Sequence, residues 1–508
     1  MTCGEFGGLW PRPRNNTVIG KETLPFIPSN IVLKEIKCKG SKCAKIGKLN
    51  AGVATLIQRA FALFVNATKK TCSPDPEIDT SICTSEAKST QIFLSISVTS
   101  EESKITLTTS EAYRLRIISK DGQVFVNISA DTFFGARHGL ETLSQLISYD
   151  EFLDSLQIVS KVDISDSPAY PYRGLMLDTS RNFFSVKSIL KLLDAMSYSK
   201  MNTFHWHLTD THSFPIFIKR QPEMSLLGAY SQKQVYSPND VKTILDHALV
   251  RGIRVLPEFD QPAHTGNGWQ WGEKAGKGKM AFCVNAVPWQ SYCVEPPCGQ
   301  LNPLNNNTYD VLSNIYLDFL DQFSPDLFHF GGDEININCW NTSTEVTDWM
   351  KSHGKRRTTD DFIEFWNMFL VRAVERLKKI NSNIPLILWS NKMTEPEYLS
   401  KYLDNKTYII QLWNKANDKS TANILNKGFR VIFSNYDHTY LDCGFGSWVG
   451  DGNNWCSPYK EWQLFYNLHP RKFFSNLNVS LDRLAGQVLG GEANMWSEQV
   501  ISPWGYCH

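Results

Sequence analysis

Eight short apolar segments between residues 172 and 498, each followed by a stretch of helical character, constrain the fold more than any other feature of this chain. Near-continuous apolar strands that alternate with helices are typical of a parallel sheet covered on both faces. Eight such units predict an α/β fold, a (β/α)8 TIM barrel. A doubly wound sheet is the alternative, but it requires a glycine-rich phosphate loop after an early strand, which this sequence lacks. The eight segments cover residues 172–178, 202–210, 254–260, 327–334, 385–390, 408–413, 430–435 and 487–498.

Residues 1–168 have a different rhythm and predict a small α/β domain that precedes the barrel. Four segments with β-branched residues and period-two alternation predict strands over 31–37, 91–98, 113–119 and 123–129. Apolar residues at helical spacing predict a helix over 132–147, with Asp131 as its N-cap. The proline-containing stretch DSPAYPYRG (166–174) ends this domain, so we place the barrel at residues 169–508.

The composition argues against two classes of binding partner, nucleic acid and a membrane that the chain would span. The net charge is +1 and no basic block occurs, which argues against a nucleic-acid surface. No apolar run reaches the roughly 20 residues needed to span a bilayer.

Cysteines and glycosylation sequons indicate the secretory pathway, with an extracellular or lysosomal destination. The chain has twelve cysteines, without the tight pairs of a zinc ribbon, so disulfides in an oxidising compartment are favoured. The start MTCGEFGGLWPRP lacks the pattern of a signal peptide, so we expect that the signal was trimmed or that the chain is partial. Asn-x-Ser/Thr sequons occur at Asn15, Asn66, Asn127, Asn306, Asn341, Asn405 and Asn478.

Carboxylates and aromatic side chains predominate where the predicted strands end, which is where TIM barrels place their active sites. Tryptophan faces beside acidic groups suit a sugar, although each tryptophan taken alone is equally well explained as core. The segment GGDE (331–334) provides two acids at one strand end, and glycoside cleavage requires a carboxylic acid that protonates the leaving oxygen. A solvated loop start is the alternative explanation of Asp333 and Glu334.

Five motifs make the prediction specific. YPYRG (170–174), HWHLTD (205–210), LPEFDQPAH (256–264), HFGGDE (329–334) and GGEANMWSE (490–498) resemble those of glycoside hydrolase family 20, the β-N-acetylhexosaminidases. CVEPPCGQLNP (293–303) and DCGFGSWVGDGNNWCSP (442–458) are similar to the insect chitooligosaccharidolytic and fused-lobes-type β-N-acetylglucosaminidases. The likeness extends into the first domain through FFGARHGLETLSQL (133–146), which it identifies as the zincin-like domain of these enzymes.

The resemblance implies a retaining exo-enzyme that needs no cofactor and no metal. The substrate's own 2-acetamido oxygen attacks the anomeric carbon, a known exception to the two-carboxylate scheme. By motif match, Glu334 is the general acid and then the base, Asp333 orients the acetamido group, and Tyr440 donates to its oxygen. Asp210 and His264 are implied as the pair that supports Glu334, with structural polar packing as the alternative.

The resemblance also implies the substrate-binding residues. Arg173 would donate to the sugar's 3-OH and 4-OH, with an ion pair across the barrel mouth as the alternative, and Asp442 and Glu498 would accept from the 4-OH and 6-OH side. Trp389, Trp413, Trp448 and Trp496 would form the walls, and Trp455 would stack a second sugar. Terminal β-GlcNAc on chitooligosaccharides or on N-glycans is the implied substrate, and removal of GalNAc is left open. The loop 264–280, which we expect on the leaving-group side, favours N-glycans.

Other expectations concern cysteines, assembly and the end of the chain. Pairing cannot be deduced from sequence, and the bridges we expect are Cys443–Cys456, Cys293–Cys298 and Cys283–Cys339. Relatives in this family are commonly dimers, which implies a homodimer. After GGEANMWSE the sequence reads QVISPWGYCH, so we expect the last barrel helix to be missing.

Two hypotheses from other classes remain. The missing helix would favour a non-catalytic sugar-binding protein or an unstable fragment. The pair His205 and His207 resembles the His-x-His metal pair of barrel hydrolases, but the fifth and sixth strand ends carry Trp389 and Trp413 in place of further ligands. We therefore interpret both histidines as structural.

Overall fold

The computed structural model describes residues 8–38, 52–72, 90–470 and 486–500, and these residues form two compact units. The first unit comprises residues 1–171 with the segments 193–202 and 246–254, and the second comprises 172–192, 203–245 and 255–508. The predicted domain division between residues 168 and 169 lies near the first of these boundaries but does not include the two short segments.

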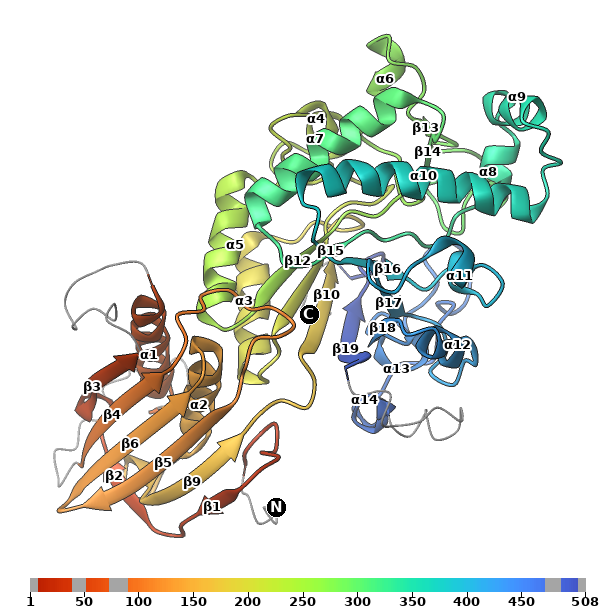
Figure 1. Cartoon of the computed structure of the whole chain (residues 1–508). Coiled ribbons are helices and arrows are strands. Elements are labelled where there is room, and N and C mark those ends of the chain that lie inside the picture. The colour runs from red at the N-terminus through yellow and green to blue at the C-terminus, as the bar shows by residue number, and fades with distance from the viewer. Residues whose placement is uncertain (1–7, 39–51, 73–89, 471–485, 501–508) are drawn as a thin grey trace. The chain divides into compact units, whose positions relative to one another are not determined.

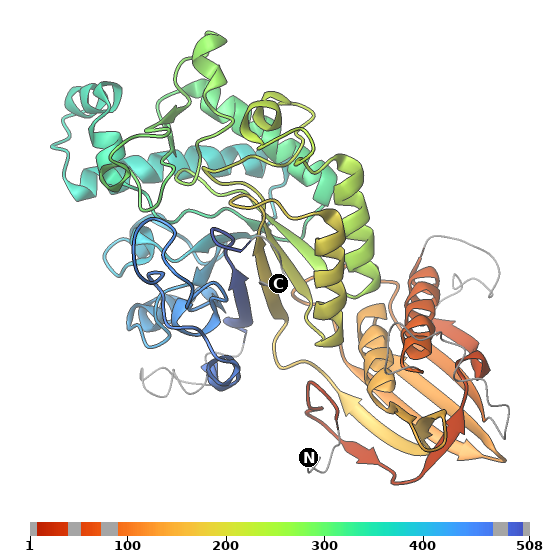
Figure 2. The same cartoon turned by 180° about the vertical axis from the view of Figure 1, so that it is seen from behind.

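The first unit is built on a six-stranded sheet in the order β1-β9-β5-β6-β4-β3, with a separate three-stranded sheet β2-β8-β7. Two helices pack on one face of the larger sheet (Figures 1 and 2). Buried and solvated residues alternate along the central strands because only this face is covered. The elements are β1 (Thr17–Ile19), β2 (Thr23–Phe26), β3 (Ile31–Cys38), α1 (Val53–Lys70), β4 (Gln91–Val98), β5 (Tyr113–Lys120), β6 (Gln123–Ala130), α2 (Phe133–Gln145), β7 (Ile147–Asp150), β8 (Ser155–Val159) and β9 (Lys161–Asp166).

The four strands and the helix predicted for this region are confirmed, but the predicted N-cap is wrong. Thr132 caps α2, and its hydroxyl oxygen accepts from the backbone N–H groups of Phe134 at 3.2 Å and Gly135 at 3.4 Å. Asp131, one residue earlier, instead accepts from the hydroxyl of Ser110.

The second unit is a closed barrel of eight parallel strands, as predicted. Residues of β11, β12 and β17 are buried without exception because side chains fill the barrel inside and helices cover it outside. The strands are β10 (Tyr172–Asp178), β11 (Thr203–His207), β12 (Arg254–Glu258), β15 (Phe328–His329), β16 (Leu386–Trp389), β17 (Tyr408–Leu412), β18 (Arg430–Phe433) and β19 (Val488–Met495).

The connections between strands carry the helices and a small extra hairpin. A capping box starts the longest helix, α10, where the Thr358 hydroxyl accepts from the N–H of Asp361 and the Asp361 carboxylate accepts from the N–H of Thr358. The helices are α3 (Val186–Tyr198), α4 (Glu223–Gly228), α5 (Pro238–Val250), α6 (Trp271–Lys274), α7 (Asn306–Phe323), α8 (Ile337–Asn341), α9 (Thr344–Ser352), α10 (Thr359–Ile380), α11 (Leu399–Tyr402), α12 (Ser420–Asn426), α13 (Tyr436–Thr439) and α14 (Trp462–Asn467), and the hairpin pairs β13 (Ala281–Phe282) with β14 (Gln300–Leu301).

Three predicted disulfides are confirmed: Cys283–Cys339, Cys293–Cys298 and Cys443–Cys456. Asn15, Asn66, Asn127, Asn306 and Asn405 are exposed, and Asn341 is half-buried. Asn478 and the expected loss of the last barrel helix, which concerns residues 501–508, lie outside the described residues. Among the helices that the structure describes, none has the length and apolar character required to cross a membrane.

Candidate active site

A pocket of about 510 Å³ opens where the barrel strands end. Its walls come from the loops that follow β10, β12, β15, β17, β18 and β19, together with the loop closed by Cys293–Cys298. The lining residues are Arg181, Asp260, His264, Glu295, Asp333, Glu334, Trp413, Tyr440, Asp442, Trp448, Asn454, Trp455, Trp496 and Glu498.

The turn that carries the two acids depends on two glycines. Strand β15 ends at His329, earlier than predicted, because Gly331 and Gly332 adopt positive φ angles of 64° and 91°. The N–H of Gly332 donates to Asp260 Oδ1 at 2.8 Å, and a Cβ added at Gly331 would lie 1.8 Å from the same oxygen. Only glycine allows this approach, which brings Asp333 and Glu334 to the pocket.

Gly331→Ala is therefore expected to lower the free energy of unfolding by about 2–5 kcal/mol, the sum of left-handed strain and overlap with Asp260. Urea unfolding measures the loss. Gly354→Ala is the matched control, since Gly354 has a φ of 67° but open space around the added Cβ, and it should cost only about 1–2 kcal/mol. Equal losses in the two variants would contradict the close approach to Asp260.

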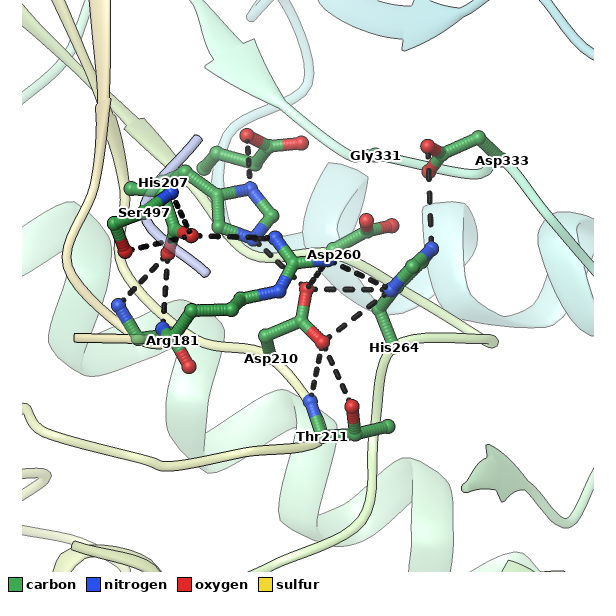
Figure 3. A network of polar contacts seen from close by, with 12 residues as sticks. Arg181, His207, Asp210, Thr211, Asp260, His264, Gly331, Asp333 and Ser497 are labelled. Atoms are coloured by element: carbon green, nitrogen blue, oxygen red, sulfur yellow. Dashed lines mark hydrogen bonds and ion pairs between the residues drawn. The ribbon is translucent and has the colours of Figure 1, made fainter. Parts of the chain in front are cut away.

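His264 lies between three carboxylates. Its Nδ1 lies 3.2 Å from Asp210 Oδ2, and its Nε2 lies 4.0 Å from Asp333 Oδ2 (Figure 3). The same Nε2 lies 3.3 Å from Glu334 Oε2. Burial lowers the pKa of His264, but Asp210 and Asp333 outweigh burial and hold this pKa well above its usual value. The ring is therefore an imidazolium between acids at neutral pH.

Arg181 is a second buried cation that contacts Asp210 Oδ2, and its Nη2 lies 3.4 Å from His264 Nδ1. Its guanidinium lies 3.0 Å from Asp210 and 3.5 Å from Asp178, contacts Glu295, and packs 5.1 Å from the ring centre of Trp496. The Glu498 carboxylate lies 3.9 Å away. One guanidinium therefore offsets several buried carboxylates (Figure 3).

Burial raises the pKa of five acids that line the pocket: Asp260, Glu295, Asp333, Asp442 and Glu498. Burial, aided by Glu334, raises the pKa of Asp333 to about 6, although His264 opposes the rise. Burial raises the pKa of Asp442 to about 7. One oxygen of each, Asp333 Oδ1 and Asp442 Oδ1, is buried without a hydrogen-bond partner among the described residues. Such oxygens are free to accept from a ligand.

The raised pKa of Asp442 predicts that ionisation of this carboxyl destabilises the folded chain as the pH rises. An unfolded Asp ionises near pH 4, so stability falls as the pH rises from about 4 through 7, because the folded state holds the proton longer. Asp442→Asn removes this cost and is expected to be more stable than the native chain by about 2–4 kcal/mol at pH 8 but not at pH 4. Urea midpoints at both pH values test it, with the exposed Asp451→Asn in the same loop as control. A pH-independent difference would contradict the shift.

The structure gathers most of the predicted site residues but corrects two of them. Arg173 is the second residue of β10, at the end of the barrel where strands begin, and it does not line the pocket. Trp389 is fully buried behind Trp496, with ring centres 5.9 Å apart, and its Nε1 donates to Glu258. Arg173 therefore cannot reach a sugar in the pocket, and Trp389 supports a wall without forming it.

Four pocket residues were given no role by the sequence: Arg181, Asp260, Glu295 and Asn454. Arg181 lies just past the end of β10, and the rule that barrel sites form at strand ends would have selected it over Arg173. Glu295 had no signal of its own, because only the closed Cys293–Cys298 loop brings it to Arg181. The loop 264–280, expected on the leaving-group side, contributes only His264 to the pocket.

The histidines of HWH lie in the barrel core. Both are fully buried, and their ring nitrogens face carboxylates: His205 contacts Glu492 and Glu258, and His207 contacts Glu258 and Asp210.

Comparisons with known proteins agree with this geometry. Residues 170–506 match the family model described as glycosyl hydrolase family 20, catalytic domain, and residues 9–146 match one described as beta-acetyl hexosaminidase like. The chain is 41% identical over 502 residues to a chitooligosaccharidolytic beta-N-acetylglucosaminidase of Bombyx mori, a match that covers 98% of this chain and 79% of that protein. It is 36% identical to a protein of Drosophila melanogaster described as "Probable beta-hexosaminidase fdl", over 98% of this chain and 76% of that one.

Among solved structures, the chitobiase of Flavobacterium johnsoniae superimposes with a TM-score of 0.71 at 25% identity. This match covers 96% of the present chain and 65% of the bacterial one.

Proposed function

We infer, from the premise that this chain belongs to glycosyl hydrolase family 20, that it removes terminal β-linked N-acetylglucosamine from non-reducing ends with retention of configuration. The motif resemblance to this family is thereby confirmed. The observation that carries the proposal is the pair Asp333 and Glu334 at one pocket wall, with a buried oxygen of Asp333 left to accept a hydrogen bond.

The proposed reaction has two steps. First, the acetamido carbonyl oxygen attacks the anomeric carbon while the bond to the leaving oxygen breaks, and Glu334 gives its proton to that oxygen. Asp333 accepts the acetamido N–H, and the Tyr440 hydroxyl donates to the acetamido oxygen. The attack closes an oxazolinium ring. In the second step a water molecule attacks the anomeric carbon and reopens this ring, while Glu334 takes a proton from the water. Two displacements at one carbon retain its configuration.

Charge placement supports these roles. The His264 imidazolium 3.3 Å from Glu334 favours the carboxylate that remains after proton transfer. Asp333 is buried, so its charge acts at full strength on the nitrogen that becomes positive in the intermediate. Asp442 and Glu498 on the opposite side offer acceptors to the sugar's outer hydroxyls, and Trp413 and Trp496 offer apolar faces.

Fluorination of the acetamido group tests the proposal. Aryl glycosides with acetyl, monofluoroacetyl, difluoroacetyl and trifluoroacetyl groups carry progressively weaker carbonyl nucleophiles. The ratio kcat/KM should fall by more than about 100-fold across the series. This fall corresponds to a rise of about 2.7 kcal/mol in the activation free energy. A flat series would overturn acetamido participation, and absence of turnover with every member would favour the sugar-binding alternative.

We propose chitooligosaccharides as the substrate class. Trp455 lines the pocket yet is 63% exposed, which suits a platform for the second sugar of a linear chain. The Bombyx mori relative is described as chitooligosaccharidolytic. A higher kcat/KM for a GlcNAc-terminated N-glycan than for chitobiose would overturn this choice.

Trp455→Ala should lower kcat/KM for chitobiose by about 2- to 10-fold, since a lost aromatic stack is worth about 0.5–1.5 kcal/mol. An aryl glycoside without a second sugar should respond little. Trp462→Ala is the control, because Trp462 is 70% exposed but does not line the pocket. Equal effects of the two substitutions on chitobiose would contradict a role for Trp455.

The secretory pathway, outside the cell or in the lysosome, is the proposed location. Three disulfides and five exposed sequons support it. Mass spectrometry of the native glycoprotein would test it through the occupied sequons. The homodimer stays a prediction, and light scattering during gel filtration tests it.

A further inference from the structure

A chain of alternating carboxylates and imidazoles runs from the barrel core to Glu334. Glu258 Oε2 lies 2.6 Å from His207 Nδ1, and His207 Nε2 lies 3.0 Å from Asp210 Oδ2. From Asp210 the path continues through His264, whose two ring nitrogens face Asp210 and Glu334. Figure 3 shows His207, Asp210 and His264 in this sequence.

The inner half of this chain is sealed from water. Glu258 and His207 are fully buried, and neither lines the pocket. Burial lowers the pKa of His207, but Glu258 and Asp210 outweigh it and hold this pKa well above its usual value. Burial raises the pKa of Glu258, yet the surrounding histidines reverse the effect and hold it well below its usual value. His207 is therefore an imidazolium that donates to a carboxylate at each nitrogen.

The indole of Trp389 fixes the other oxygen of Glu258, because its Nε1 donates to Oε1 at 2.7 Å. His329 Nδ1 lies 3.1 Å from the same oxygen, but it accepts from the backbone N–H of Gly331 at 3.2 Å. An indole can only donate, so a glutamine at position 258 must keep its oxygen toward Trp389. Its NH2 group then faces both ring nitrogens that contact Glu258 Oε2, His207 Nδ1 and His205 Nε2. Both nitrogens have to become acceptors, and His207 loses its charge.

We propose that Glu258 and His207 are positioning residues for the acid/base Glu334, acting through Asp210 and His264. The inference rests on the proposed function, because it assigns Glu334 the proton transfer. Glu258 fixes the charge and ring orientation of His207. His207 in turn holds Asp210 by a charge-assisted hydrogen bond, and Asp210 aims His264 at Glu334. Neither residue contacts substrate.

The dependence on leaving group separates this role from a merely structural one. A sugar leaving group needs the proton from Glu334, whereas a dinitrophenolate departs without it. Glu258→Gln should lower kcat/KM for chitobiose by about 10–100-fold, part of the 100- to 10,000-fold that general acid catalysis supplies. The same variant should lower kcat/KM for dinitrophenyl β-N-acetylglucosaminide by less than about threefold. A loss of folded protein would lower both equally.

Glu492→Gln is the matched control. Glu492 is also buried in the barrel core and accepts from His205 Nδ1 at 2.8 Å and from the amide of Gln411 at 2.6 Å, but it contacts neither His207 nor Asp210. It should leave the ratio of the two kcat/KM values unchanged. If Glu258→Gln does not fold, His207→Gln serves instead, since its amide can still donate to Asp210 but carries no charge.

The outcomes are distinct. A leaving-group-dependent loss in Glu258→Gln or His207→Gln, with none in Glu492→Gln, supports the inference. If Glu334→Gln shows that dependence but the core variants lower kcat/KM for both substrates equally, or lower neither, the inference is overturned. If Glu334→Gln lacks the dependence too, the proposed function itself is overturned.

Discussion

Glu334→Gln should lower kcat/KM for chitobiose by about 100- to 10,000-fold, the range that general acid catalysis contributes. The amide keeps the shape of the side chain but has no proton that it can transfer to the leaving oxygen. The value of kcat/KM for dinitrophenyl β-N-acetylglucosaminide should fall far less, because the leaving group of this substrate needs no protonation. Steady-state kinetics on both substrates, beside thermal melts of both proteins, measure the effect.

Glu498→Gln provides the control within the same pocket. Glu498 lies beside Arg181, away from the Asp333 and Glu334 pair, and is proposed to bind an outer hydroxyl. Its replacement should lower kcat/KM for both substrates by a similar factor, since the lost contact does not depend on the leaving group. If Glu334→Gln and Glu498→Gln gave the same pattern, Glu334 would not be the acid.

Arg181→Met should lower the free energy of unfolding by about 3–5 kcal/mol at pH 7.5, the cost of removing one partner from a buried ion cluster. Burial already raises the pKa of Glu498 well above its usual value, and Glu295 adds to the rise. Without the guanidinium these carboxyls ionise at still higher pH, so the variant should recover stability as the pH falls toward 5. Urea unfolding at both pH values measures it.

Lys392→Met is the surface counterpart. Lys392 pairs with Glu395, and the two side chains are 42% and 40% exposed, so its loss should cost at most about 1 kcal/mol. A pH-independent loss in Arg181→Met would show that packing against Trp496, rather than charge, sets its contribution.

The barrel could be predicted because its signal is local. Each strand reads as an apolar run, and parallel strands buried on both faces leave no other pattern. The cap of α2 was misjudged by one residue because Asp131 and Thr132 are both good N-caps, and only the structure shows which hydroxyl or carboxylate faces the free N–H groups.

The site was predictable where a residue directly follows its strand. Asp333 and Glu334 follow β15, and Trp496 follows β19, so topology alone brings them together. Arg173 was misplaced because its motif includes the beginning of a strand, and position along the strand decides which end of the barrel a side chain reaches. Glu295 depends on a loop that no strand anchors, which local patterns cannot resolve.

Closure of the barrel by its first and last strands has a consequence for biosynthesis. Strand β10 pairs with β19, and Asp178 accepts from both the N–H and the hydroxyl of Ser497, at 3.1 and 3.0 Å. Contacts between such distant parts of a chain form late. A ribosome must therefore release residues 488–498 before Trp496 and Glu498 can complete the pocket. The nascent chain is inert for most of its synthesis, and catalytic competence arrives in a single late step.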